Sequence, residues 1–157
     1  MPLTLASADF AAQGKIPALH TGKGADLSPE LHWSGAPAGT RSFALVVTDP
    51  DAPDPANPKV IWTHWLLYGL PASTAALPRG LKRWELPRGT REGKNDWQAT
   101  GWRGPCPPIG KHRYYFRLYA LDEVTPDLGG PDRARLEQVI TGHVLEVAEL
   151  VGTFEKP

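Results

Sequence analysis

The sequence predicts a mostly β, single-domain protein with one or two short helices. Residues 43–47 form a continuous apolar run, which is typical of a strand buried on both faces. Residues 61–68 are rich in aromatic and β-branched side chains, and the large side chains of residues 114–121 alternate between two faces, as in a strand. The chain also contains 17 prolines and 16 glycines, and those between the apolar runs favour turns and long loops.

The remaining elements are shorter. Residues 3–5 and 31–33 are candidate edge strands. Residues 133–140 have a helical apolar spacing and follow an Asp that can cap the first turn, while Gly142 is a plausible stop. Residues 144–154 fit either a helix or a strand; we prefer a strand because Gly142 ends the helix and β-type residues close the segment. With 157 residues and no repeat or compositional break, we expect one domain spanning 1–157.

Charge and composition exclude several classes of protein. The formal net charge is zero, so the chain lacks the basic footprint of a nucleic-acid binder. Cys106 is the only cysteine, which rules out an internal disulfide and fits a reducing compartment. No apolar run is long enough for a membrane span, and residues 1–5 do not resemble a secretory signal. We therefore expect a cytoplasmic protein; a periplasmic location stays open if a signal peptide was removed.

Two proline-stiffened segments carry most of the functional information. Residues 48–53 read Thr-Asp-Pro-Asp-Ala-Pro, and residues 104–114 read Gly-Pro-Cys-Pro-Pro-Ile-Gly-Lys-His-Arg-Tyr. Because proline fixes φ and removes a backbone donor, both segments should be loops that form rigid edges of a cleft rather than parts of a sheet. They bring Asp49, Asp51 and His112 to the ends of predicted strands.

The order of these motifs, with Leu-Ser-Pro-Glu-Leu-His-Trp at 27–33 and Trp-Thr-His-Trp at 62–65, resembles the phosphatidylethanolamine-binding protein family. The chain looks most like the bacterial branch called Raf-kinase-inhibitor-like. The resemblance implies a two-sheet, β-sandwich-like fold with a small anion pocket where the motifs meet. It departs from many relatives in having Trp102 and Phe154 where they have tyrosine, and in ending without a longer helix over the pocket.

The resemblance implies a pocket lined by Asp49, His64 and His112. Two imidazoles beside a carboxylate suit a phosphate or carboxylate ligand if the rings are protonated or donate N–H groups. Glycines permit close backbone approach with free N–H donors, and Trp62 and Trp102 are candidate aromatic walls. The predicted ligand-binding residues are Asp49, Asp51, Trp62, His64, Gly104, Pro107, Pro108, Gly110 and His112.

These residues lead us to expect a non-enzymatic protein that binds a small anion such as phosphate or a phospho-head group, without a cofactor or metal. The resemblance also allows the protein to regulate a protein partner through this pocket, and to form a homodimer. One alternative is a hydrolase that uses Asp49 with either histidine, or Cys106 with His112, although no nucleophile-elbow motif is present. Another is a metal site built from both histidines with Asp49 and Asp51, but the ligand spacing is not that of known sites.

Several of these residues also have purely structural interpretations. Asp51 could simply stiffen its own loop, His64 could be a hydrogen-bonded core histidine, and Cys106 could be a packing residue of its loop. The charged stretch 79–94 reads as a solvated loop with alternating signs. The sequence does not decide whether Trp84 and Trp97 belong to the core or to an interface.

Overall fold

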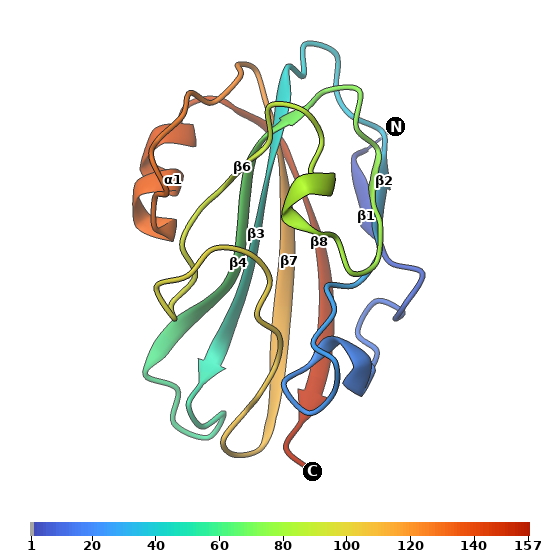
Figure 1. Ribbon diagram of the computed structural model, residues 1–157, viewed down its shortest axis with the longest axis vertical. Helices are drawn as coiled ribbons and strands as arrows, with labels where there is room; N and C mark the ends of the chain where they lie inside the picture. The colour runs from blue at the N-terminus through green and yellow to red at the C-terminus, as the bar shows by residue number, and fades with distance from the viewer. Residues whose placement is uncertain (1) are drawn as a thin grey trace.

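The computed structural model describes residues 2–157, which form two antiparallel sheets and one α-helix (Figure 1). The strands are β1 (Thr4–Ala6), β2 (Leu31–Ser34), β3 (Ser42–Ala52), β4 (Val60–Pro71), β5 (Ala76–Leu77), β6 (Arg91–Glu92), β7 (Lys111–Leu121) and β8 (Val144–Glu155). The helix is α1 (Arg133–Ile140), and two short 3-10 helices are η1 (Ala18–His20) and η2 (Arg83–Glu85).

The larger sheet has five strands in the order β6-β4-β3-β7-β8, and the smaller one has the order β1-β2-β5. The larger sheet is covered on one face by α1 and on the other by the smaller sheet (Figure 1). The predicted mostly β, two-sheet fold is therefore confirmed. The continuous apolar run of β3 fits its central position, because both of its faces are buried. Phe43, Leu45 and Val47 pack in the core between the sheets, while Ala44 and Val46 pack beneath α1.

The C-terminal elements follow the sequence prediction closely. Helix α1 covers the predicted residues, and the Asp132 carboxylate accepts a hydrogen bond from the backbone N–H of Arg135 at 2.8 Å. Gly142 has a φ of 90°, the left-handed conformation that ends helices. Residues 144–155 form a strand, so the preference for β over helix is confirmed.

The prediction that residues 48–53 form a loop is wrong. Strand β3 continues through Asp49 and Pro50 to Ala52, so these motif residues belong to the sheet. The pairing with β4 becomes irregular between Asp49 and Ala52, and this irregularity accommodates Pro50, which has no N–H to donate. The second motif likewise enters the sheet earlier than predicted, because β7 begins at Lys111.

The stretch 79–94, predicted as a solvated loop, also contains η2 and the short strand β6. Two of its opposite charges are in contact: Arg83 and Glu92 form an ion pair at 2.9 Å. Trp84, at the middle of η2, is 83% exposed and is therefore not a core residue.

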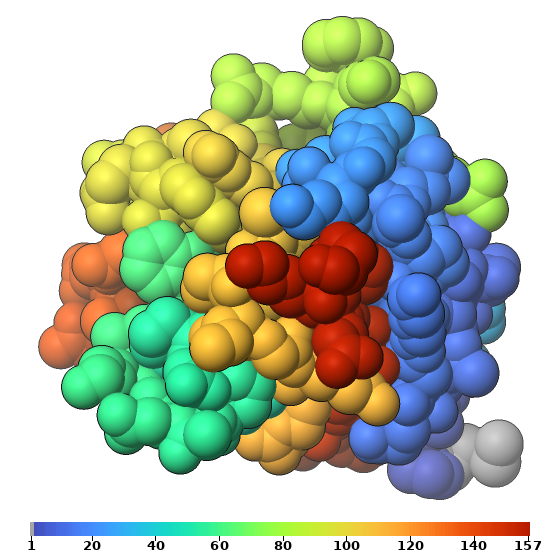
Figure 2. Space-filling view, turned by 90° about the horizontal axis from the view of Figure 1, so that it is seen from below, coloured from blue at the N-terminus to red at the C-terminus, as the bar shows by residue number. Residues whose placement is uncertain are grey.

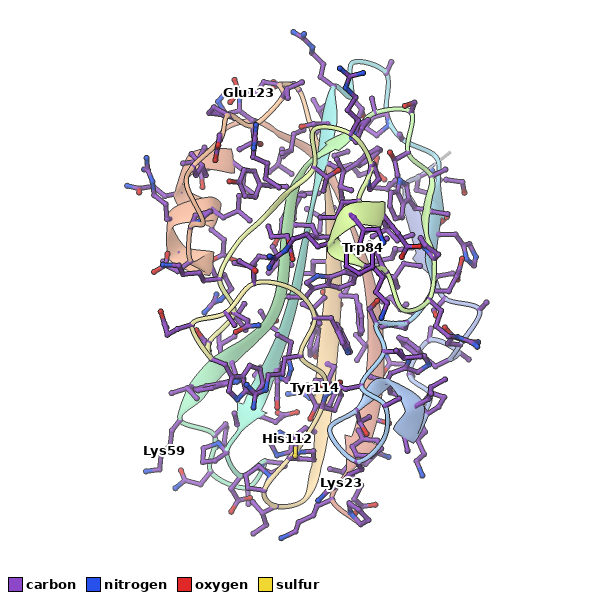
Figure 3. All side chains as sticks on the ribbon, in the orientation of Figure 1. Lys23, Lys59, Trp84, His112, Tyr114 and Glu123 are labelled. Carbon is purple, nitrogen blue, oxygen red and sulfur yellow. The ribbon has the colours of Figure 1, made fainter. Side chains whose placement is uncertain are left out.

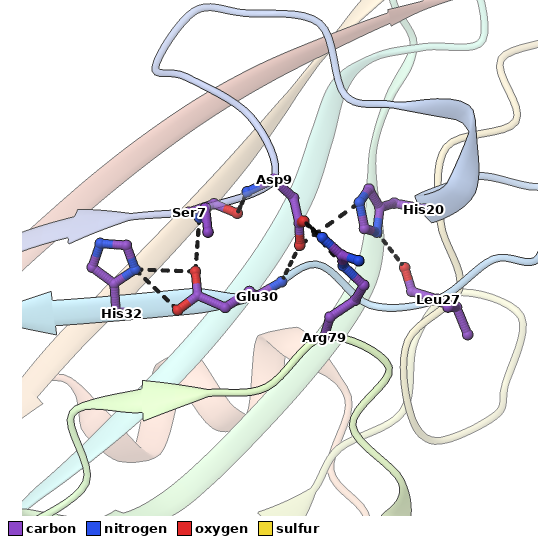
Figure 4. Close-up of polar contacts among 8 residues, drawn as sticks. Ser7, Asp9, His20, Leu27, Glu30, His32 and Arg79 are labelled. Atoms are coloured by element: carbon purple, nitrogen blue, oxygen red, sulfur yellow. Dashed lines mark hydrogen bonds and ion pairs between the residues drawn. The ribbon is translucent and has the colours of Figure 1, made fainter.

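A polar cluster around Asp9 attaches the N-terminal segment to the rest of the fold (Figure 4). The Asp9 carboxylate accepts hydrogen bonds from the backbone N–H of Glu30 at 2.7 Å and from the guanidinium of Arg79. The guanidinium lowers the pKa of Asp9. His20 lies beside it, with Nε2 at 3.8 Å, and its Nδ1 contacts the Leu27 carbonyl.

Across residues 2–157, no helix has both the length and the apolar character needed to span a bilayer.

Candidate functional site

A pocket of about 450 Å³ lies at the end of the larger sheet where β3 ends and β7 begins. Figure 2 views this end of the molecule, where the blue N-terminal segment, the green β3–β4 connection, the gold start of β7 and the red C-terminus come together. Figure 3 places His112 and Tyr114 in this region, with Lys59 further out. The lining residues are Asp49, Ala52, Pro53, Lys59, Val60, Trp62, His64, Trp97, Cys106, Pro107, Pro108, His112 and Tyr114.

The pair formed by Asp49 and His112 is fully buried in the pocket wall. Asp49 Oδ2 lies 2.5 Å from His112 Nδ1, and Asp49 Oδ1 accepts from the backbone N–H of Asp51 at 2.7 Å. His112 Nε2 donates to the carbonyls of Ile109 at 2.9 Å and Pro53 at 3.1 Å. Both ring nitrogens of His112 are thus engaged by the protein. Burial raises the pKa of Asp49, and the hydrogen bond from His112 opposes that effect.

His64 is held in a single orientation by the backbone of Arg103. Its Nδ1 lies 2.5 Å from the Arg103 carbonyl oxygen, and its own carbonyl accepts the Arg103 N–H at 3.3 Å. Because a carbonyl oxygen only accepts, Nδ1 carries the proton. Burial lowers the pKa of His64 to about 4, with a smaller contribution from nearby His112. The ring is therefore neutral near pH 7.

Tyr114 is a site residue that sequence reasoning missed. It is 1% exposed and lines the pocket, yet its hydroxyl makes no hydrogen bond with any residue in the range 2–157. Burial raises the pKa of Tyr114, so the group remains a hydroxyl donor. Its signal was present in the second motif, two positions after His112 on the same face of β7.

Trp97 is a second missed residue, and the structure assigns it to the pocket. Its indole packs edge-on against Trp62 at 5.4 Å and against His64 at 5.1 Å between ring centroids. Its loop is attached to β4, because the Asp96 carboxylate accepts the N–H of Thr63 at 2.7 Å and the Asp96 N–H donates to the Thr63 carbonyl at 3.0 Å. Nothing in the local sequence distinguishes Trp97 from a core tryptophan.

Two predictions about the loop before β7 need correction. Gly104 does not offer a free N–H, since this group donates to Asp26 at 2.9 Å. A side chain at position 104 would collide with the His20 carbonyl and the Asp26 carboxylate, so glycine is required for packing. Trp102 is not a pocket wall: it packs against Trp65 and Phe116 in the core, and its Nε1 donates to Asp26 at 3.1 Å.

Asp51 and Gly110 lie outside the pocket lining. The Asp51 carboxylate accepts from the backbone N–H of Arg113 at 2.8 Å and from its guanidinium at 2.8 and 3.0 Å, so it connects β3 to β7. This ion pair borders a separate surface hollow with Lys111. Gly110 has a φ of 76° and packs beside Pro55, which accounts for glycine there. The structure thus brings together six of the nine predicted residues: Asp49, Trp62, His64, Pro107, Pro108 and His112.

The alternative chemistries find little geometric support. Within residues 2–157, no group of three or more His, Cys, Asp and Glu side chains is arranged to hold a metal ion. Cys106 is exposed and lines the pocket, but the partner proposed for it, His112, has both ring nitrogens committed to Asp49 and to carbonyl groups. His112 could act as a general base only after losing these bonds.

Comparisons with known proteins place the chain in context. Residues 6–155 match the family model described as phosphatidylethanolamine-binding protein. A UPF0098 protein of Methanothermobacter thermautotrophicus is 40% identical over 148 residues, which covers 94% of this chain and 95% of that protein.

Two crystal structures have closely similar folds. A phosphatidylethanolamine-binding protein homolog from Chlamydia trachomatis is 35% identical, with a TM-score of 0.90 over 99% of both chains. E. coli YbcL, described as a member of the mammalian family, is 30% identical, with a TM-score of 0.89 over all of both chains.

Proposed function

This chain belongs to the phosphatidylethanolamine-binding protein family, and we propose that it binds a small oxyanion, phosphate or a phospho-head group, in the pocket between β3, β4 and β7. The observation that carries the proposal is the convergence of Asp49, His64, His112 and Tyr114 on one cavity. Apart from Lys59 and Cys106, its other lining residues are apolar or aromatic. A few polar groups at fixed positions in an apolar pocket are typical of small-molecule sites.

The pocket has groups suited to different parts of such a ligand. The Tyr114 hydroxyl is an unpaired donor for an oxyanion oxygen, and Lys59 supplies a positive charge at the rim. Trp62 and Trp97 meet at 85° and form an apolar corner for an organic substituent. A ligand bound in this way could also regulate a protein partner that contacts the pocket mouth.

We propose binding without turnover. A hydrolase needs a nucleophile next to a free base. For Cys106 the proposed base is His112, whose two ring nitrogens are both engaged. For Asp49 the nucleophile itself is engaged, because its two carboxylate oxygens are held by His112 and by the backbone N–H of Asp51. Assays with generic ester and phosphoester substrates test this point. Hydrolysis lost in both Cys106→Ala and His112→Ala would establish the enzyme instead.

NMR titration of the labelled protein with phosphate, acetate and phosphoethanolamine tests the binding site. We expect the largest shifts at Asp49, His64, His112 and Tyr114 and at the indole of Trp97. Shifts confined to the second hollow beside Asp51 and Arg113 would contradict the proposal, because those residues lie outside the pocket. The titration also ranks the three ligands by affinity.

A further inference from the structure

The pattern of hydrogen-bond donors and acceptors in the pocket carries an inference about the ligand's protonation state. His112 Nε2 faces only carbonyl oxygens and must therefore be N–H. The close contact between His112 Nδ1 and Asp49 Oδ2 requires one further proton between the two atoms. Wherever that proton sits, the pair has no net charge and no N–H left for a ligand.

His64 presents an acceptor rather than a donor. Its Nδ1–H is used by the Arg103 carbonyl, and Nε2 has no hydrogen-bond partner among residues 2–157. Nε2 is therefore a bare lone pair on a buried side chain that is 3% exposed and lines the pocket. A ligand oxygen with no hydrogen would meet repulsion at this atom, whereas a hydroxyl group would donate to it.

The surrounding groups do not change this assignment. Proline backbones at positions 53, 107 and 108 contribute no N–H to the wall. The titratable and charged groups around His64 are Asp49 on β3, His112 and Tyr114 on β7, and Lys59, Arg103 and Cys106 on the connecting loops.

We infer that the pocket selects an oxyanion that still carries a proton, donating its hydroxyl to His64 Nε2 while another oxygen accepts from the Tyr114 hydroxyl. This inference rests on the proposed function of the pocket. It names the ligand class as a protonated phosphate or phosphomonoester and excludes an oxyanion of the same shape without a proton.

Phosphate and sulfate separate these possibilities because they share a tetrahedral shape, and only phosphate keeps a proton between about pH 5 and 8. Sulfate could bind only with a protonated His64, which is about one molecule in a thousand at neutral pH when the pKa is about 4. We expect phosphate to bind at least ~10-fold more tightly than sulfate near pH 7, measured by calorimetry.

A phosphomonoester provides a sharper test by pH. Methyl phosphate loses its last proton near pH 6. Its affinity should therefore fall up to about tenfold per pH unit above that value, whereas sulfate binding should stay weak from about pH 6 to 8. An affinity for methyl phosphate that is constant or rises with pH would overturn the inference.

Two matched variants assign the effect to His64. His64→Asn retains a donor for the Arg103 carbonyl but lacks the Nε2 acceptor, so the ratio of phosphate to sulfate affinity should fall toward one. Tyr114→Phe removes a donor that serves both ions, so both should weaken while their ratio stays. Separately, ¹⁵N NMR of the free protein should show His64 Nε2 without a proton; a protonated Nε2 would overturn the inference even if His64→Asn failed to fold.

The outcomes also separate the inference from the proposed function. Equal binding of phosphate and sulfate would leave an anion pocket but overturn proton selection. If neither ion nor methyl phosphate binds in the pocket, the proposed function fails and the inference fails with it.

Discussion

His112 and Tyr114 stand two residues apart on one face of β7, yet they differ in what they can offer a ligand. Both ring nitrogens of His112 are engaged by the protein, Nδ1 by Asp49 and Nε2 by backbone carbonyls, so the ring is a fixed part of the pocket wall. Tyr114 is equally buried, but its hydroxyl makes no hydrogen bond with any residue in the range 2–157. The motif histidine therefore positions the site, while the tyrosine is available for contact.

Replacing Asp49 should therefore affect stability as well as binding. In Asp49→Ala the buried His112 Nδ1 and the Asp51 N–H both lose their partner, and we expect the free energy of unfolding to fall by about 1–3 kcal/mol. In Asp49→Asn the amide can donate to Nδ1 and still accept from Asp51, so the loss should be less than half as large. Urea denaturation measures both. Equal losses in the two variants would contradict the hydrogen-bond assignment.

Tyr114→Phe should show the opposite behaviour. Because the hydroxyl is unpaired in the free protein, its removal should change the free energy of unfolding by less than about 0.5 kcal/mol. Phosphate affinity should weaken by about 0.5–1.5 kcal/mol, the typical value of one hydrogen bond. Calorimetry and urea denaturation measure the two quantities. A large loss of stability with unchanged binding would show that the hydroxyl serves the fold.

At the scale of elements, the pocket depends on two loops that the backbone of β4 holds in place. The Arg103 segment exchanges hydrogen bonds with His64, and the Asp96 segment does the same with Thr63. Position 97 could not be assigned from the sequence because its contact with Trp62 depends on this loop conformation, across 35 residues of chain. By contrast, β4 and β7 were predictable from local sequence. The first is rich in aromatic and β-branched residues, and the large side chains of the second alternate between two faces.

Asp96→Ala should loosen the loop that holds Trp97 against Trp62 and His64. The N–H of Thr63 loses its acceptor, so its hydrogen exchange should accelerate at least ~10-fold, and phosphoethanolamine should bind more weakly. Asp96→Asn is the matched control, since its amide oxygen can still accept from Thr63. Unchanged exchange at Thr63 in Asp96→Ala would show that the loop is held by other contacts.

For the molecule as a whole, the sequence predicted the mostly β class from its apolar runs and alternation, and the C-terminal helix from its spacing and its capping Asp. It predicted the final strand from Gly142 and the β-type residues that follow, because periodicity left that segment open. It failed at Asp49 to Ala52 because proline rules describe a regular ladder, and here an irregular pairing with β4 keeps Pro50 within the strand. It also could not separate Asp49 from Asp51. The two carboxylates lie beyond Thr48, where the regular pairing of β3 with β7 ends, and there one contacts His112 and the other Arg113.

Burial of neutral His64 in the folded protein makes global stability depend on pH. Its pKa is about 4 when folded, against 6.5 for an ordinary histidine, so the unfolded chain binds more protons between these values. The contribution of His64 is therefore fully present above about pH 6.5 and is lost as pH falls toward 4, a change of about 3 kcal/mol. The raised pKa of Asp49 acts in the opposite direction, since a folded state that binds its proton more tightly is favoured at low pH.

His64→Asn separates the two contributions, because it removes the imidazole and leaves Asp49 in place. Urea denaturation of both proteins at a series of pH values should give a difference in unfolding free energy that grows in favour of the native sequence between about pH 4 and 6.5 and is constant above. A difference that does not change with pH over this interval would mean that His64 titrates alike in both states. The neutral, accepting imidazole on which proton selection depends would then be wrong as well.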